Sequence, residues 1–456
     1  MAAHVIDFLT LGNNFGTPEM RSIWSEENRF RKQIEVEIAL AKAEGELGEL
    51  GVIPSEAANK IAQLVKVEAL NFNELAEEAV RLRHTFMATI NALQRQSGDA
   101  GEYIHYGATT QDIVDTATVL QLKEAFEIVL RDTRLVAQEL KTLAKKYQYL
   151  PMVGRTHGMQ ALPTTFGFKL AVWLDEFVRH LQRLNEIRDR VLVGNISGAI
   201  CTYASFGKKG PEVEARALAL LGLNAPNIGW QAARDRFSEY ASVVALISGT
   251  LGKIANEFYN LMRTEINEIE EPFSSGKIGS STMPHKRNPA ALEGMASLTS
   301  PIFKSVALIH ESMRVEHERD AMSWRAEWIA LPEMNIYLSA QLQIGLSILR
   351  GMKVNAEQML KNLELQNGLL LSEKVMFELG KRLGKQSSHS LVYECSMKAF
   401  EEARSFKDVL LENPIIKKEF NESEITEWLV PQNYLGSAPD KVDIVIRYAE
   451  LSGLLD

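Results

Sequence analysis

Residues 112–150 read DIVDTATVLQLKEAFEIVLRDTRLVAQELKTLAKKYQYL and contain neither glycine nor proline. Steps of three and four residues connect a mostly apolar series within them: Val119, Leu122, Phe126, Val129, Thr133, Val136, Leu140 and Leu143. Such a heptad seam, sustained over nearly four heptads, predicts one long helix packed in a near-parallel bundle. We interpret the seam as core rather than as part of a binding site.

Two further segments carry the same pattern. One runs from about Thr164 to the region of Arg190, and its apolar face is Phe166, Leu170, Trp173, Phe177, Leu184, Ile187 and Val191. The other starts near Gln231, and its face is Phe237, Tyr240, Val244, Ile247, Leu251, Ile254, Phe258 and Leu261. Strand patterns do not alternate with these helices. The sequence therefore predicts an all-α fold with a central bundle of long antiparallel helices.

Two smaller helical domains are expected to flank this bundle. The long-helix periodicity begins near residue 111 and ends near residue 355, which predicts an N-terminal domain (1–111), a central domain (112–355) and a C-terminal domain (356–456). Helix starts are indicated near the N-terminus by Thr17 before a proline and by Ser25 before two glutamates, because such residues cap helices.

The composition is that of an ordinary globular protein, with 46% hydrophobic and 24% charged residues. A formal charge of −9 disfavours non-specific binding to nucleic acid. Two cysteines without a CxxC motif fit a reducing compartment. The N-terminus lacks a basic segment followed by an apolar core, and no apolar run is long enough to cross a bilayer. We expect a cytoplasmic protein with neither a nucleic-acid partner nor a membrane partner.

Three polar loops, residues 103–112, 154–160 and 272–289, adjoin the predicted long helices. The last reads PFSSGKIGSSTMPHKRNP. Its glycines and prolines argue against a core helix or strand, and polar loops between rigid helices often carry function. Amides of its Gly-Ser-Ser run could cradle an anion beside Lys286 and Arg287. Composition alone fits a solvated surface loop equally well.

These loops also carry a resemblance. Residues 279–289, GSSTMPHKRNP, resemble the GSSxMPxKxNP signature of the fumarase/aspartase superfamily. Residues 106–112 and 154–158 resemble the superfamily's other two active-site regions, in the same order and spacing. The His-Lys-Arg version of the signature is similar to adenylosuccinate lyases and carboxymuconate cycloisomerases. The resemblance covers nearly the whole chain, up to the turn at residues 433–436.

The resemblance implies both an assembly and a reaction. Members of this superfamily are homotetramers whose active sites combine loops from three subunits, and no cofactor is implied. Their lyases remove a proton beside a carboxylate and expel an amine or alcohol from the neighbouring carbon, usually forming fumarate. We therefore expect β-elimination from a small anionic di- or tricarboxylate, with cleavage of a C–N or C–O bond.

Roles follow for individual residues by the same resemblance. Ser280 is expected to be the base, with Ser281 as the alternative, and His157 the general acid. Lys286 and Asn288 would stabilise the dianionic intermediate. Substrate-binding positions are expected at Thr109, Thr110, His84, His105, Thr156, Ser281, Met283 and Arg319. His105 could instead cap the loop. His285 and His317 lack the neighbouring carboxylate or cysteine ligands of a metal site, so no metal is expected.

The sequence combines features of two subfamilies, the adenylosuccinate lyases and the cycloisomerases. Residues 318–320 resemble the HERD segment of adenylosuccinate lyases, but Trp328 stands where those enzymes place a phosphate-binding arginine, and Thr85 stands where they place aspartate. In contrast, the tryptophans at positions 230, 324 and 328 resemble the pattern of the cycloisomerases. Arg314 or Arg325 could still supply a cation for a phosphate from a different direction.

The favoured interpretation is an adenylosuccinate-lyase-like enzyme with a different substrate. Three alternatives stay open. They are a carboxymuconate-type cycloisomerase, adenylosuccinate lyase itself, and a catalytically silent helical bundle. Retention of the catalytic set argues against the last. Adenylosuccinate is predicted to be a poor substrate at best, since a nucleotide phosphate needs its own cations.

Overall fold

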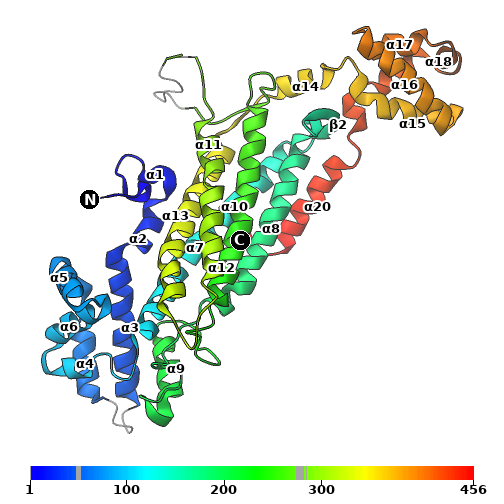
Figure 1. The fold of residues 1–456 in the computed structure, drawn as a ribbon. Helices are drawn as coiled ribbons and strands as arrows, with labels where there is room; N and C mark the ends of the chain where they lie inside the picture. The colour runs from blue at the N-terminus through cyan, green and yellow to red at the C-terminus, as the bar shows by residue number, and fades with distance from the viewer. Residues whose placement is uncertain (1, 48–52, 274–281, 284, 456) are drawn as a thin grey trace. The chain divides into compact units, whose positions relative to one another are not determined.

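The computed structural model describes residues 2–47, 53–273, 282–283 and 285–455 (Figure 1). Its longest helices are α7 (Thr110–Lys146), α8 (Phe166–Val191), α10 (Asp235–Leu261) and α13 (Ala321–Gly351). Strands are few and short, so the predicted all-α fold is confirmed. Among the described residues, no helix is both long and apolar enough to span a membrane.

The chain divides into two compact units. Unit 1 comprises residues 1–132, 180–249 and 297–343, and unit 2 comprises residues 133–179, 250–296 and 344–456. Each of the four long helices contributes residues to both units. The division into three domains that the sequence indicated stays a prediction.

Unit 1 contains the N-terminal helices and parts of the long ones. Its shorter helices are α1 (Gly12–Phe15), α2 (Pro18–Ile23), α3 (Glu26–Glu46), α4 (Ser55–Leu64), α5 (Phe72–Leu82), α6 (Thr85–Ser97), α9 (Gly210–Leu220) and α12 (Thr299–Glu311). Both predicted caps are present, since the hydroxyls of Thr17 and Ser25 each accept a backbone N–H at 3.2 Å. These caps satisfy donors that the first helical turns leave unpaired.

Unit 2 contains two small antiparallel sheets and the C-terminal helices. The strands are β1 (Pro151–Thr156) with β2 (Met159–Thr165), and β3 (Ile269–Glu270) with β4 (Lys353–Val354). The helices are α11 (Ala290–Ser297), α14 (Ala356–Glu364), α15 (Ser372–Leu383), α16 (Lys385–Glu401), α17 (Phe406–Glu412), α18 (Pro414–Glu419), α19 (Glu422–Trp428) and α20 (Ala438–Leu451). Aromatic contacts of Phe258 with Phe166 and Trp173 join α10 to α8 in this unit.

The predicted seams form the core of both units. All eight seam residues of α7 are at most 8% exposed, and the predicted faces of α8 and α10 are buried to a similar degree. In unit 1 the rings of Phe126 and Tyr240 lie 5.8 Å apart, which places α7 against α10 there. Burial of such long apolar faces is the main favourable contribution to folding.

The segment 154–160 corrects the sequence analysis, which treated it only as a polar loop. It belongs to the β1–β2 hairpin, whose two-residue turn is His157–Gly158. Both turn residues have positive φ, 54° and 79°. This is the backbone shape that a tight type I′ hairpin turn requires, and it matches the twist of the flanking strands.

Glu44, on α3, is a buried acid that yields a stability prediction. It is 1% exposed, and neither carboxylate oxygen has a hydrogen-bond partner in the described part of the chain. Burial, with a smaller contribution from Glu37, raises its pKa to about 9. The folded state thus keeps a proton that the unfolded state releases near its ordinary pKa of about 4.3.

Unfolding free energy should therefore fall as pH rises between those two values, by up to about 1.4 kcal/mol per pH unit from this one group. Glu44→Gln should remove that slope, so thermal melting temperatures of variant and parent should diverge from pH 5 to pH 8.5, with the variant higher. The exposed Glu46, ion-paired with Arg216, supplies the matched control, Glu46→Gln. Parallel melting curves for Glu44→Gln and parent would contradict the assignment.

Candidate active site

The Thr109–Thr110 loop is fixed by Asp112, on the first turn of α7. The Asp112 carboxylate accepts hydrogen bonds from the backbone N–H of Thr109 at 3.0 Å. It also accepts from the N–H groups of Ser197 and Gly198 at 3.1 and 2.9 Å. Asp112 is fully buried, and burial raises its pKa to about 6 against the opposing effect of these bonds.

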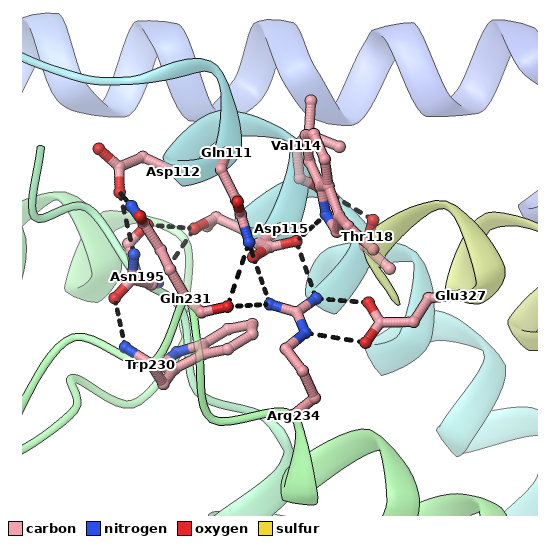
Figure 2. Close-up of polar contacts among 12 residues, drawn as sticks. Gln111, Asp112, Val114, Asp115, Thr118, Asn195, Trp230, Gln231, Arg234 and Glu327 are labelled. Carbon is pink, nitrogen blue, oxygen red and sulfur yellow. Dashed lines mark hydrogen bonds and ion pairs between the residues drawn. The ribbon is translucent and has the colours of Figure 1, made fainter. Parts of the chain in front are cut away.

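Two amide side chains complete this cluster. Figure 2 shows Asp112 beside Asn195 and Gln231, whose nitrogens each donate to Oδ1 of Asp112 at 2.9 Å. One carboxylate thus ties the start of α7 to segments some 80 and 120 residues further along the chain. The cluster therefore orients Thr109 and Thr110, while its own side chains are buried and do not face solvent.

Arg319 and Thr109, both predicted from motifs, meet in unit 1. Nη1 of Arg319 donates to Oγ1 of Thr109 at 3.1 Å. The loop before α13 is held by Asp320, which accepts backbone N–H groups of Glu316, Met322 and Ser323 at 2.7–2.8 Å. A guanidinium beside a hydroxyl at a helix start provides donors that suit a carboxylate.

His84 and Thr110 line one cavity of about 520 Å³ in unit 1. His84 caps α6, because its Nδ1 accepts the N–H of Met87 at 3.1 Å. The other cavity walls include residues of α3, α6, α7 and α13, and a role of His84 and Thr110 in substrate binding stays a prediction.

His105 has a structural partner. Its Nδ1 lies 2.8 Å from Oε1 of Glu37, which is 2% exposed, and its backbone N–H donates to the other oxygen at 3.1 Å. Burial lowers the pKa of His105, but the Glu37 carboxylate outweighs it and raises the pKa overall. The positive φ of 61° is stabilised by these contacts. A contact between His105 and substrate stays a prediction.

His157 and Thr156 lie exposed at the tip of the β1–β2 hairpin in unit 2. The preceding residue, Arg155, anchors the hairpin by donating to both oxygens of the buried Glu268 at 2.7 and 3.1 Å. Asn362 donates to the same carboxylate at 2.8 Å. This anchor escaped the sequence analysis, because no motif connects positions 155, 268 and 362.

The signature loop is described only in part. Ser280 and Ser281 lie outside the described residues. Met283 and Lys286 are exposed and Asn288 is half-buried, and the Lys286 N–H donates to the Met283 carbonyl at 3.0 Å. In the described part of the chain, no carboxylate pairs with the Lys286 ammonium.

Acidic residues hold the flanks of this loop. Arg287 pairs with Glu270 at 3.0 Å and stacks 4.6 Å from the ring centre of Phe273. Glu271 accepts the first N–H groups of α11 at 3.0 and 3.3 Å. The positive charge expected from Arg287 is therefore partly neutralised, whereas Lys286 forms no ion pair in the described part of the loop. Across the described ranges, no cluster of three His, Cys, Asp or Glu is arranged to hold a metal ion.

Comparison with known proteins identifies the family. A family model described as Lyase matches residues 14–303, and one described as Adenylosuccinate lyase C-terminus matches residues 368–445. The chain belongs to this lyase family. The resemblance to the fumarase/aspartase superfamily is thereby confirmed, and the chain is an enzyme of the lyase type.

Three relatives show where the chain lies within the family. An N-acetyl-S-(2-succino)cysteine lyase of Dickeya dadantii is 73% identical over 455 residues and is covered completely, as is this chain. An adenylosuccinate lyase of Methanocaldococcus jannaschii is 42% identical, with 98% of this chain and 96% of the relative covered. The 3-carboxy-cis,cis-muconate lactonizing enzyme of Pseudomonas putida has a TM-score of 0.90 at 34% identity, with 96% and 98% covered. The two sequence relatives and the structural neighbour all lie in the predicted branch of the superfamily, and the structural neighbour has the same fold.

Proposed function

We propose that the enzyme cleaves the C–S bond of an S-succinyl thioether, with N-acetyl-S-(2-succino)cysteine as substrate and fumarate and N-acetylcysteine as products. The observation that carries this proposal is the 73% identity, over complete chains, to an enzyme named for that substrate. This substrate differs from the expectation drawn from the sequence, which was cleavage of a C–N or C–O bond. A thioether is the third heteroatom linkage that the same elimination can break.

The proposed reaction balances as a simple elimination. A base removes a proton from the succinyl carbon that does not bear sulfur, and the negative charge spreads into the neighbouring carboxylate. The C=C bond of fumarate then forms while the C–S bond breaks, and the bonding electron pair leaves with sulfur as a thiolate. One proton goes to the base and one is returned to the thiolate, so no oxidant or cofactor is consumed.

Each step has a proposed group. Ser280 is the base, and the ammonium of Lys286 with the amide of Asn288 stabilises the charge that develops on the carboxylate. His157 returns a proton to sulfur. A thiol has a pKa of about 8.5, so a thiolate departs with less acid assistance than an amine would need. Thr109, Thr110 and Arg319 are proposed to hold the carboxylates of the succinyl half.

We also propose a cytoplasmic homotetramer in which loops from different subunits complete each site. The support is the superfamily resemblance, together with the exposure of His157 and Lys286 on the described surface. Subunits that lack different catalytic groups should then complement one another when mixed.

The direct test is product analysis with purified enzyme. Incubation with N-acetyl-S-(2-succino)cysteine should raise fumarate absorbance and release free thiol in a one-to-one ratio, and the thiol is titrated with a chromogenic disulfide. Adenylosuccinate and carboxymuconate serve as comparison substrates. Formation of fumarate without thiol, or no reaction with the thioether, would contradict the proposal.

A further inference from the structure

The cavity that His84 and Thr110 share is also lined by residues of other helices. Its remaining walls include Arg29 and Gln33 from α3 and Trp324 and Trp328 from α13. At about 520 Å³ it has room for a substituent well beyond a succinyl group.

Arg29 is a partly buried cation that forms no ion pair with the described residues. Burial lowers its pKa, and Glu26 only partly offsets this effect by raising it. In the described part of the chain its guanidinium makes neither a hydrogen bond nor an ion pair. The guanidinium carbon of Arg29 lies 4.9 Å from the ring centre of Trp328, in a cation–π contact. A desolvated charge of this kind is unfavourable until an anion pairs with it, so the position suits a carboxylate.

Gln33 lies one helical turn after Arg29, on the same face of α3. It is 3% exposed, and its amide oxygen has no hydrogen-bond partner among the described residues. A buried acceptor without a donor is costly, and a rotation of the Gln33 side chain toward the cavity that it lines would let a ligand N–H satisfy this oxygen. Arg29 and Gln33 therefore offer a site for a carboxylate beside an N–H group.

The two tryptophans form a fixed aromatic wall. Their ring centres lie 4.8 Å apart in an edge-to-face arrangement, and Nε1 of Trp324 donates to Oδ1 of Asp115 at 2.7 Å. Asp115 is itself paired with the buried Arg234 at 2.6 Å, and Arg234 with Glu327 at 2.8 Å (Figure 2). A wall oriented by a buried ion-pair network suits small apolar groups such as an acyl methyl or a thioether.

We infer that this cavity recognises the leaving-group half of the substrate as an N-acylated α-amino acid. Arg29 pairs with its carboxylate, Gln33 accepts its amide N–H, and the tryptophans contact the acyl group. The inference rests on the proposed function and assigns the residues that set its leaving-group specificity. It also predicts discrimination against a free α-amino group, because the cavity lining carries three arginines, Arg29, Arg83 and Arg325, against one carboxylate, Glu26, and this excess of positive charge disfavours an ammonium.

The test pairs enzyme variants with matched substrates. Replacing the leaving group's carboxylate by a carboxamide should lower kcat/KM of the parent by about 10- to 100-fold, the scale for losing a charge-assisted hydrogen bond. Arg29→Met should show little further loss with the carboxamide, because the two changes remove one interaction. Gln33→Leu should likewise abolish the preference for N-acetyl over N-acetyl-N-methyl substrate. Arg31→Met, on the same helix but paired with Glu27 and Glu68, is the control and should behave as the parent.

Binding separates this inference from the proposed reaction. Titration calorimetry with N-acetylcysteine should detect a complex with the parent that weakens at least about 10-fold in Arg29→Met. The inference is overturned if Arg29→Met and Gln33→Leu, both folded by circular dichroism, keep the parent's substrate preferences. If the parent binds N-acetylcysteine through Arg29 but releases no fumarate from the thioether, the proposed function fails and the cavity assignment stands.

Discussion

Ser280→Ala should lower kcat by at least about two orders of magnitude, the scale for removing a general base from an elimination. KM should change little, because the hydroxyl acts on the proton that leaves rather than on the bound carboxylates. The expectation comes from the GSSTMPHKRNP signature, since position 280 lies outside the described residues. Fumarate absorbance under saturating substrate measures the effect.

The neighbouring serine provides the matched control. Ser281→Ala changes the same side chain one position along and should cost much less than Ser280→Ala. The reverse order of effects would make Ser281 the base. Mixing Ser280→Ala with His157→Gln under conditions of subunit exchange should restore part of the activity, because some sites then receive both intact loops. Exchange without recovery would contradict the shared active site.

Lys286→Met should reduce kcat by about 10²- to 10³-fold, the cost of removing a group that stabilises charge developing in the transition state. The adjacent Arg287 is the control, because it is already paired with Glu270 and stacked on Phe273. Arg287→Met should therefore lose less than about tenfold. Equal losses in both variants would show that the loop's overall charge matters rather than the Lys286 ammonium.

The fold was largely predictable because its determinants are periodic. The seam from Val119 to Leu143 specifies a helix face wherever it lies in the protein, and all of it is buried. The β1–β2 hairpin was missed because Gly154 and Pro163, residues that are disfavoured inside strands, interrupt its two strands. The dipeptide His157–Gly158 was the available signal, since a glycine in a two-residue turn between extended segments favours a type I′ hairpin.

Candidate site residues could be proposed from the sequence only where they belong to motifs. Thr109, His157 and Lys286 were proposed from contiguous patterns, whereas Glu268 and Asn362 act from positions that only the folded chain brings to Arg155. Their contribution is a contact, and contacts between distant segments leave no local signature in one sequence.

Trp328 illustrates a similar limit in the substrate cavity. By resemblance, a tryptophan replaces an arginine at this position, and Arg314 or Arg325 was expected as a possible substitute cation. In the structure Arg314 is paired with Glu311, and the cation stacked on Trp328 is Arg29 from α3. A partly buried guanidinium without an ion-pair partner among the described residues cannot be recognised from spacing, because its burial depends on tertiary packing.

The central claim is that the enzyme acts on a succinylated thiol rather than on a succinylated nucleotide. The ratio of kcat/KM for N-acetyl-S-(2-succino)cysteine to kcat/KM for adenylosuccinate, measured in one fumarate assay, tests it most directly. We predict about 10⁴ M⁻¹s⁻¹ or more for the thioether, in the usual range for a dedicated enzyme, and a value at least about 100-fold lower for adenylosuccinate. A ratio near or below one would contradict the account.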